Sequence, residues 1–371
     1  MRILVILLAA FAFFILERFI YGKNFHKGLT FDVRFDSLGV FEGEGAVIIE
    51  TLINKKLMPV WWCSLQFSVS RFLLFQGEEQ KGKVNDYYRR ELLTLFSYEK
   101  VVKRLNITCS KRGYFKIKEL SITSGDLFAK DKFLLNSSSE VEFFVYPSII
   151  DNPTFKLSFE RILGDIITKR NLIQDTFQLR GIRDYVPSDS FKGINWKATA
   201  RTGEMKVNEY EYTSSIEVLF FLNVERYNSW DPENLVEEGI RLINTLALSY
   251  MEKGIPVGLL TNGCDILTGE EVYMKPSGGV NQNLLLSQTL AKLDINKVTR
   301  PINEVLSQEL FKGRKEAVMI MVSHFHPKDL VTNIEEAQVK GYDIKWIIPK
   351  KAKEELSISS IKDLYVWEVE N

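Results

Sequence analysis

The sequence predicts an α+β multidomain protein in which an N-terminal transmembrane helix is followed by a β-sandwich domain and a doubly wound α/β domain. Three observations lead to this fold class. Residues 3–16 form an unbroken apolar run, short segments up to about residue 150 alternate apolar and polar side chains, and buried strands alternate with helical patterns after residue 216. A length of 371 residues suits about two globular domains.

The N-terminal apolar run predicts a membrane anchor over residues 1–22. Taken as one helix with residues 17–21, the run is about long enough to cross a bilayer. A cleavable signal peptide is the alternative, but no small-x-small cleavage site follows the run. Basic residues are more numerous after the run than before it: Arg18, Lys23 and Lys27 against Arg2. This asymmetry predicts a single-pass protein of the cell membrane whose remaining chain lies in the cytoplasm.

Residues 29–150 predict a β-sandwich domain. Short segments with period-two alternation are separated by polar or glycine-bearing turns, as at residues 46–53, 64–69, 101–108 and 141–146. Many short strands without long helical patterns are typical of two packed antiparallel sheets.

Residues 155–371 predict an α/β domain, which begins after a boundary marked by the prolines of residues 147–153. The apolar segment 216–222 is typical of a strand buried on both faces, and further strands follow at residues 256–260, 317–322 and 344–348. Helical spacing lies between them at residues 235–251, 282–293 and 329–340, with a start signal at Asp231 and Pro232. This alternation predicts a largely parallel sheet with helices on both faces.

Composition argues against two classes of function. The 48 basic residues are balanced by 48 acidic ones, so the chain lacks the surplus of positive charge that a dedicated nucleic-acid binder needs. The three cysteines are far apart in sequence and show no C-x-x-C spacing, which predicts neither a disulfide framework nor a cysteine zinc motif. We therefore expect no nucleic-acid partner and no cofactor.

The most distinctive segment is residues 179–201, where charged, aromatic and turn-forming residues alternate too densely for an ordinary strand or surface helix. Its candidate site residues are Arg183, Asp184, Tyr185, Asp189, Asn195, Trp196, Lys197 and Arg201. One interpretation is structural, because Arg183 and Arg201 can form bidentate ion pairs with neighbouring carboxylates. The other is a docking surface for a second protein, because Trp, Tyr and Arg often dominate the binding energy of interfaces. The two interpretations are compatible.

The same segment resembles the signature of the bacterial domain of unknown function 58 family. Gly181, Arg183, an acid at position 184, Tyr185 and Asp189 stand in the family's order, followed by INWKATAR at residues 194–201. Asp184 replaces the family's usual Glu, and Ser188 replaces a Gly that would permit positive φ. Shorter resemblances lie at residues 41–44, 111–114 and 145–147.

The resemblance implies a von Willebrand factor A-like (Rossmann-like) fold for residues 155–371. Such folds carry a metal-ion-dependent adhesion site at the strand ends, built from a D-x-S-x-S motif, a Thr and a second Asp. The first positions of that motif are occupied here by Asn223, Glu225 and Tyr227, and the matching Thr and second Asp are missing from the sequence. We therefore expect a degenerate site that binds no metal.

The predicted strand ends also carry a second set of reactive side chains. Cys264 follows the second strand of the α/β domain, and His324 and His326 follow the third. Together with Glu225 they could form a thiolate nucleophile or a Zn²⁺ site. The alternative is that Cys264 is a turn residue and that both histidines only hydrogen-bond the end of their strand.

These observations predict a membrane-anchored, non-enzymatic adaptor or scaffold protein. The resemblance implies a MoxR-type AAA+ ATPase as its partner, in protein assembly or maturation. Two other functions stay open. One is a thiol- or metal-dependent enzyme that uses Cys264 and His324, and the other is an extracytoplasmic adhesion-type module, which requires the opposite membrane orientation.

Overall fold

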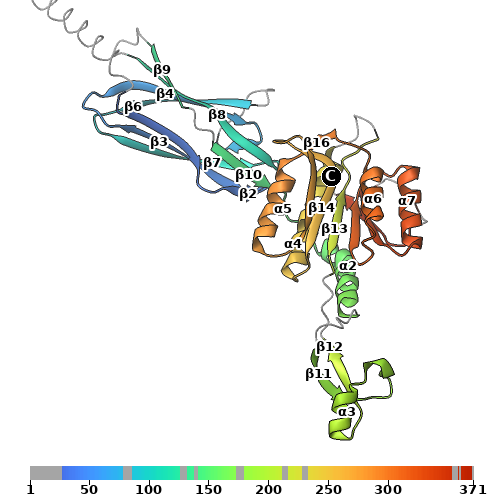
Figure 1. Ribbon diagram of the computed structural model, residues 1–371. Coiled ribbons are helices and arrows are strands. Elements are labelled where there is room, and N and C mark those ends of the chain that lie inside the picture. The colour runs from blue at the N-terminus through green and yellow to red at the C-terminus, as the bar shows by residue number, and fades with distance from the viewer. Residues whose placement is uncertain are drawn as a thin grey trace, which may run out of the picture. The chain divides into compact units, whose positions relative to one another are not determined.

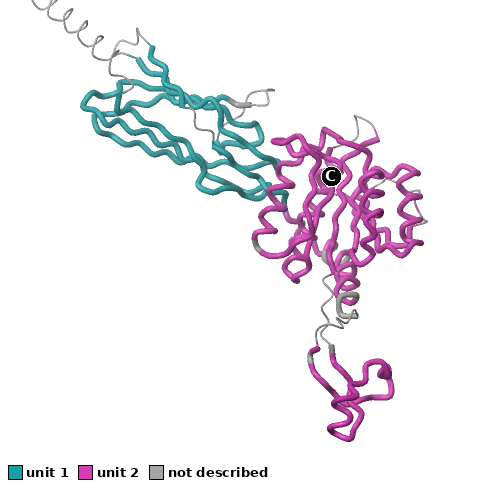
Figure 2. Tube along the Cα trace, viewed as in Figure 1, with its two compact units in different colours: residues 1–148 teal, residues 149–371 magenta. Residues whose placement is uncertain are grey.

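A computed structural model describes residues 27–77, 86–125, 132–137, 141–172, 179–210, 216–227, 233–352, 358 and 361–369. The chain divides into two compact units, residues 1–148 and residues 149–371 (Figure 2). The predicted helix start at Asp231 and Pro232 lies outside the described residues.

The first unit is a β-sandwich of two mainly antiparallel sheets. The four-stranded sheet has the order β1 (Leu29–Phe35), β3 (Gly45–Asn54), β7 (Lys100–Cys109) and β5 (Leu73–Phe75). The other sheet has the order β2 (Gly39–Phe41), β10 (Val141–Tyr146), β8 (Gly113–Gly125), β4 (Val60–Ser70) and β6 (Asp86–Leu95), with β9 (Lys132–Asn136) paired to β8.

Alternation along the strands builds the core of this sandwich. In β3, every second residue is buried, and Ile48 and Leu52 pack in one cluster with Phe67 of β4 and Phe143 of β10. The two sheets therefore share one hydrophobic core, as the period-two pattern requires.

The second unit is built on a seven-stranded sheet with helices on both faces (Figure 1). Its order is β15 (Glu271–Ser277), β14 (Val257–Asp265), β13 (Val218–Leu222), β17 (Val318–Val322), β18 (Asp343–Lys351) and β19 (Leu364–Val369), with β16 (Leu293–Val298) paired to β14. The strands from β14 to β19 in this order run parallel, whereas β15 and β16 pair antiparallel with β14. The helices are α2 (Pro153–Leu172), α4 (Glu233–Glu252), α5 (Val280–Lys292), α6 (Ile302–Phe311) and α7 (Lys328–Val339).

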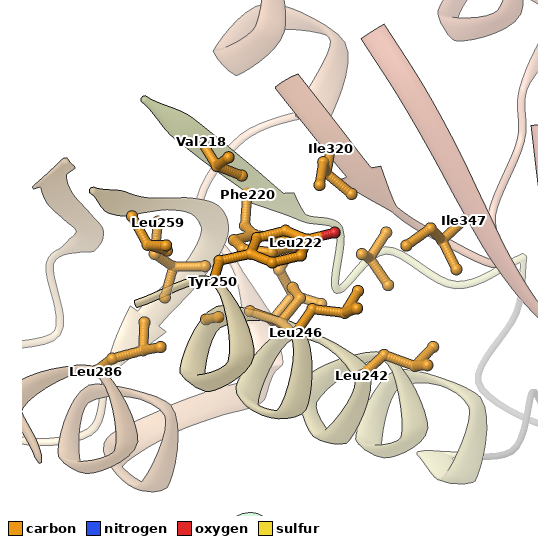
Figure 3. Close-up of a cluster of buried hydrophobic side chains, with 14 of the residues drawn as sticks. Val218, Phe220, Leu222, Leu242, Leu246, Tyr250, Leu259, Leu286, Ile320 and Ile347 are labelled. Atoms are coloured by element: carbon orange, nitrogen blue, oxygen red, sulfur yellow. The ribbon is translucent and has the colours of Figure 1, made fainter. Parts of the chain in front are cut away.

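The central strand shows why this sheet is buried on both faces. All five residues of β13 are buried. Phe220 packs in one cluster with residues of α4, including Tyr250 (Figure 3). Phe221 belongs to the other cluster, which includes residues of α6 and α7. On the adjacent strand β14, glycine is required at position 258, because a Cβ there would lie 2.8 Å from the carbonyl oxygen of Met274 on β15. A strand covered by helices on each side has no polar face, which explains its continuous apolar sequence.

The predicted fold class is wrong in its transmembrane element. Within the described ranges, no helix is both long enough and apolar enough to cross a membrane. The 20-residue helices α2 and α4 have the length, but each carries several charged side chains. The predicted anchor over residues 1–22 lies outside the described ranges. The predicted single-pass localisation with a cytoplasmic soluble part depended on that anchor and is corrected with it.

Candidate functional site

Residues 179–210 form a small lobe, which we call the signature lobe. Its strand β11 (Leu179–Asp184) pairs antiparallel with β12 (Lys206–Tyr210), and between them lie the 3-10 helix η1 (Phe191–Gly193) and α3 (Trp196–Thr202) (Figure 1). Its buried hydrophobic residues among those described are Ile194 and Val207. Large apolar side chains are exposed at Leu179, Ile182, Val186, Phe191, Trp196 and Met205. The lobe therefore has little core of its own, and large apolar side chains lie on its surface among charged ones.

An ion pair holds the turn that follows β11. Arg183 donates from Nη1 to Asp189 Oδ2 at 2.7 Å and from Nη2 to Oδ1 at 2.6 Å. The backbone N–H of Val186 donates to Asp189 Oδ2 at 2.9 Å. The hydrogen bonds from Arg183, and next that from Val186, lower the pKa of Asp189 to about 2. The carboxylate is therefore ionised at neutral pH, and its hydrogen bonds stabilise the turn.

The second predicted acid has a partner on the opposite strand. Lys206 on β12 forms an ion pair with Asp184, and its Nζ also lies 3.4 Å from Glu204 Oε2. The hydrogen bond to Asp184 is the main reason that the pKa of Lys206 lies above its ordinary value. Asp184 and Asp189 thus both form ion pairs with basic residues of the lobe itself.

Asn195 orients the helix that carries Trp196. Its Oδ1 accepts from the N–H of Ala198 at 2.9 Å, which caps the start of α3, and its Nδ2 donates to Asn208 Oδ1 at 2.7 Å. Trp196 is the first residue of this helix and remains 66% exposed. Tyr185 packs beside Phe191 with 5.9 Å between ring centroids, and Lys197 and Arg201 are exposed.

A second polar cluster lies where the parallel strands end, and we call it the strand-end rim (residues 223–227, 262–264 and 323–326). Asn223, directly after β13, donates to Ser323 Oγ at 3.0 Å and accepts from Asn262 Nδ2 at 2.9 Å. Asn262 Oδ1 accepts from the N–H of Val224 at 2.9 Å. All three polar side chains are buried. Their hydrogen-bonding groups therefore tie three neighbouring strands together.

Glu225 belongs to the same network. Its Oε2 accepts from the N–H of Ile302 at 2.8 Å, at the start of α6, and from Asn262 Nδ2 at 3.1 Å. Burial is the main cause that raises the pKa of Glu225 above its ordinary value. The carboxylate therefore serves as a helix cap, and a negative charge at this end of α6 also suits the helix dipole.

The remaining rim candidates are only partly brought together. Tyr227 is half-exposed, its hydroxyl accepts from the N–H of His326 at 3.1 Å, and its ring meets Phe325 edge-on with 4.7 Å between centroids. Cys264 and His324 are buried. Across the described residues, no group of three or more His, Cys, Asp or Glu side chains could hold a metal ion. The alternative Zn²⁺ site at this rim is therefore not assembled.

Sequence reasoning missed Asn262, which joins Asn223 and Glu225. The available signal was a polar pair, Thr261 and Asn262, inside the otherwise apolar strand β14, where both side chains are fully buried. Buried amides require partners, and here the partners come from the neighbouring strand.

Comparison with known proteins agrees with the signature. The model of the family described as "Protein of unknown function DUF58" matches residues 181–357. The chain is 24% identical over 178 residues to the uncharacterized protein YeaD of Bacillus subtilis (strain 168), covering 47% of this chain and 41% of that protein. The chain therefore matches less than half the length of this curated relative. The predicted resemblance is confirmed at this level, whereas the von Willebrand factor A-like relation and the MoxR association stay predictions.

Two solved structures resemble about a third of the chain at low similarity. One is the CARDB domain of the PF1109 protein from Pyrococcus furiosus, with 16% identity, 32% of this chain and 93% of that chain covered, and a TM-score of 0.21. The other is the seventh ScaB type I cohesin from Pseudobacteroides cellulosolvens, with 9% identity, 33% and 96% covered, and a TM-score of 0.22.

Proposed function

We propose that this protein is a non-enzymatic adaptor or scaffold that binds another protein through the signature lobe. The observation that carries the proposal is the surface of that lobe. Trp196 and Phe191 are 66% and 68% exposed, although the ion pair of Arg183 with Asp189 and the cap by Asn195 fix the surrounding backbone. Exposed aromatic side chains on a fixed scaffold lose little conformational freedom on binding and are common anchors of protein interfaces.

The strand-end rim supports a non-catalytic role. A general acid or base needs a polar group directed at a substrate. In the rim, Asn223, Asn262 and Glu225 instead donate to and accept from one another and the backbone of α6. This arrangement stabilises the strand ends where related α/β folds bind ligands.

The proposed partner is a MoxR-type AAA+ ATPase, and the proposed process is protein assembly or maturation. The resemblance to the domain of unknown function 58 family is the reason for choosing this partner. The family match covers residues 181–357, which include nearly all of the signature lobe. Among the described residues of this region, the lobe carries the exposed tryptophan, Trp196, whereas Trp346 is buried.

The test is a binding measurement between the purified full chain and a purified MoxR-type ATPase from the same organism. We expect Trp196→Ala to weaken binding at least about tenfold, because a central Trp anchor typically contributes that much. The matched control is Trp61→Ala, since Trp61 is 42% exposed on the β-sandwich. Unchanged affinity of the Trp196 variant, or a lack of association by the wild-type chain, would contradict the proposal.

A further inference from the structure

The signature lobe uses only part of its positive charge internally. Arg183 and Lys206 form its ion pairs with Asp189, Asp184 and Glu204. Three further basic side chains, Lys192, Lys197 and Arg201, are exposed. No acidic side chain of the described lobe forms an ion pair with any of these three. The lobe therefore displays positive charge that its own carboxylates do not neutralise.

Two of these cations lie on the same short helix as the exposed Trp196. Lys197 and Arg201 are four residues apart on α3, so they lie on the same side of the helix. Trp196 is the first residue of the same helix, directly before Lys197, and is 66% exposed. The short helix thus carries one exposed indole and two exposed cations, and the preceding 3-10 helix η1 carries the third exposed cation, Lys192.

We infer that the lobe binds an acidic protein surface with an apolar pocket that receives Trp196. This inference rests on the proposed docking function and specifies the chemistry of the partner's surface. Charge complementarity selects the acidic surface, and the exposed indole selects the pocket.

A protein surface fits the lobe better than a phosphate backbone does. The side chains of Asp184 and Glu204 are each 76% exposed although they pair with Lys206. A regular array of phosphates would approach these carboxylates as well as the cations, which opposes binding. A protein partner can place its acidic residues opposite the three cations alone.

Binding of the lobe to an acidic surface should weaken as the salt concentration rises. Attraction between exposed charges weakens as the Debye length falls from about 10 Å at 0.1 M salt to about 3 Å at 1 M. The cations should therefore act mainly on the association rate at low salt, whereas Trp196 should contribute at every salt concentration.

The test uses the full chain and a purified MoxR-type ATPase at 50 and 500 mM NaCl. The variant Lys192→Glu/Lys197→Glu/Arg201→Glu should bind the ATPase at least tenfold more weakly than wild type at 50 mM NaCl. The difference in affinity between this variant and wild type should be smaller at 500 mM NaCl. The affinity of the neutral variant Lys192→Gln/Lys197→Gln/Arg201→Gln should fall between that of wild type and that of the charge-reversed variant. The matched control is Lys100→Glu/Lys118→Glu/Lys132→Glu, which makes the same charge change at exposed positions of the β-sandwich and should stay within twofold of wild type.

The outcomes separate this inference from the proposed function. A wild-type chain that does not bind the ATPase overturns both. Binding that survives the lobe charge reversal, or falls equally in the control, overturns the acidic-surface inference alone. Tighter binding to single-stranded DNA or to phosphatidylglycerol vesicles than to the ATPase, lost on charge reversal, overturns it in favour of a phosphate ligand. Unchanged circular dichroism of the neutral variant verifies that lost binding does not reflect unfolding.

Discussion

Replacing Glu50 by Gln should stabilise the β-sandwich at neutral and alkaline pH. Glu50 lies on β3 and is completely buried, with its Oε1 3.5 Å from Arg89 Nε. Neither carboxylate oxygen has a hydrogen-bond partner among the described residues. Glu91 and Lys103 also face this carboxylate and form an ion pair with each other. Gln at position 50 would remove the buried charge and leave Arg89 beside Glu91, at 3.5 Å.

The magnitude follows from the pKa of the Glu50 carboxyl. Burial is the main cause that raises this pKa from 4.5 to about 7, against the opposing effect of Arg89. The folded chain therefore holds the proton more tightly than the unfolded chain, so stability is greatest below pH 4.5 and falls as pH rises to about 7. At about 1.4 kcal/mol for each pH unit between the two pKa values, the full loss is about 3 kcal/mol. Gln imitates the protonated form and should avoid this loss.

Hydrogen exchange in the full chain, corrected for intrinsic rates, measures the effect in the relevant strands. At pH 8, the opening free energy of β3 and β7 should be about 3 kcal/mol higher in Glu50→Gln than in wild type. At pH 5 the difference should fall below about 1 kcal/mol. The control is Glu142→Gln on β10, which makes the same substitution at a side chain that is 54% exposed. A Glu50 variant no more stable than wild type at pH 8 would refute this reasoning.

Three further predictions concern the two candidate sites. Asn262→Ala leaves Asn223 and the N–H of Val224 without their buried partner, so urea denaturation should show a loss of about 1–3 kcal/mol in unfolding free energy. Asn195→Ala removes the cap of α3, and amide exchange in that helix should accelerate by about fivefold, equivalent to about 1 kcal/mol. Because the pKa of Asp189 is about 2, the wild-type turn should keep its amide NMR shifts from pH 7 to pH 3 and lose them only as pH falls through 2, whereas Asp189→Asn should disturb the turn at every pH.

Local sequence patterns were enough to locate several strands and the signature segment. They were not enough to identify which residues pair over long distances in the sequence. The apolar segment 216–222 contains β13, because a strand buried on both faces carries its signal in its own residues. The sequence was compatible with several ion pairs for Arg183, and the structure forms the one with Asp189. The hydrogen bond from the N–H of Val186 to Asp189 holds the turn in which this pair forms. The strand β12 was not predicted, because its pairing with β11 depends on residues more than 20 positions away.

The buried charges were also beyond sequence reasoning. Glu50 occupies an inward position in an alternating strand, where its sequence neighbours predict only an apolar face. The role of Glu225 depends on Ile302, 77 residues further along the chain. The membrane-spanning element was predicted from the apolar length of residues 3–16 alone, and no helix in the described part of the chain is long and apolar enough to cross a membrane.

The central proposal is that the signature lobe is the surface that binds the ATPase. Hydrogen exchange of the full chain with and without the purified MoxR-type ATPase tests this directly. We expect new protection from exchange in peptides covering residues 186–203, with little change in the strand-end rim or the β-sandwich. Protection centred on residues 223–227 and 323–326 with an unchanged lobe would contradict it.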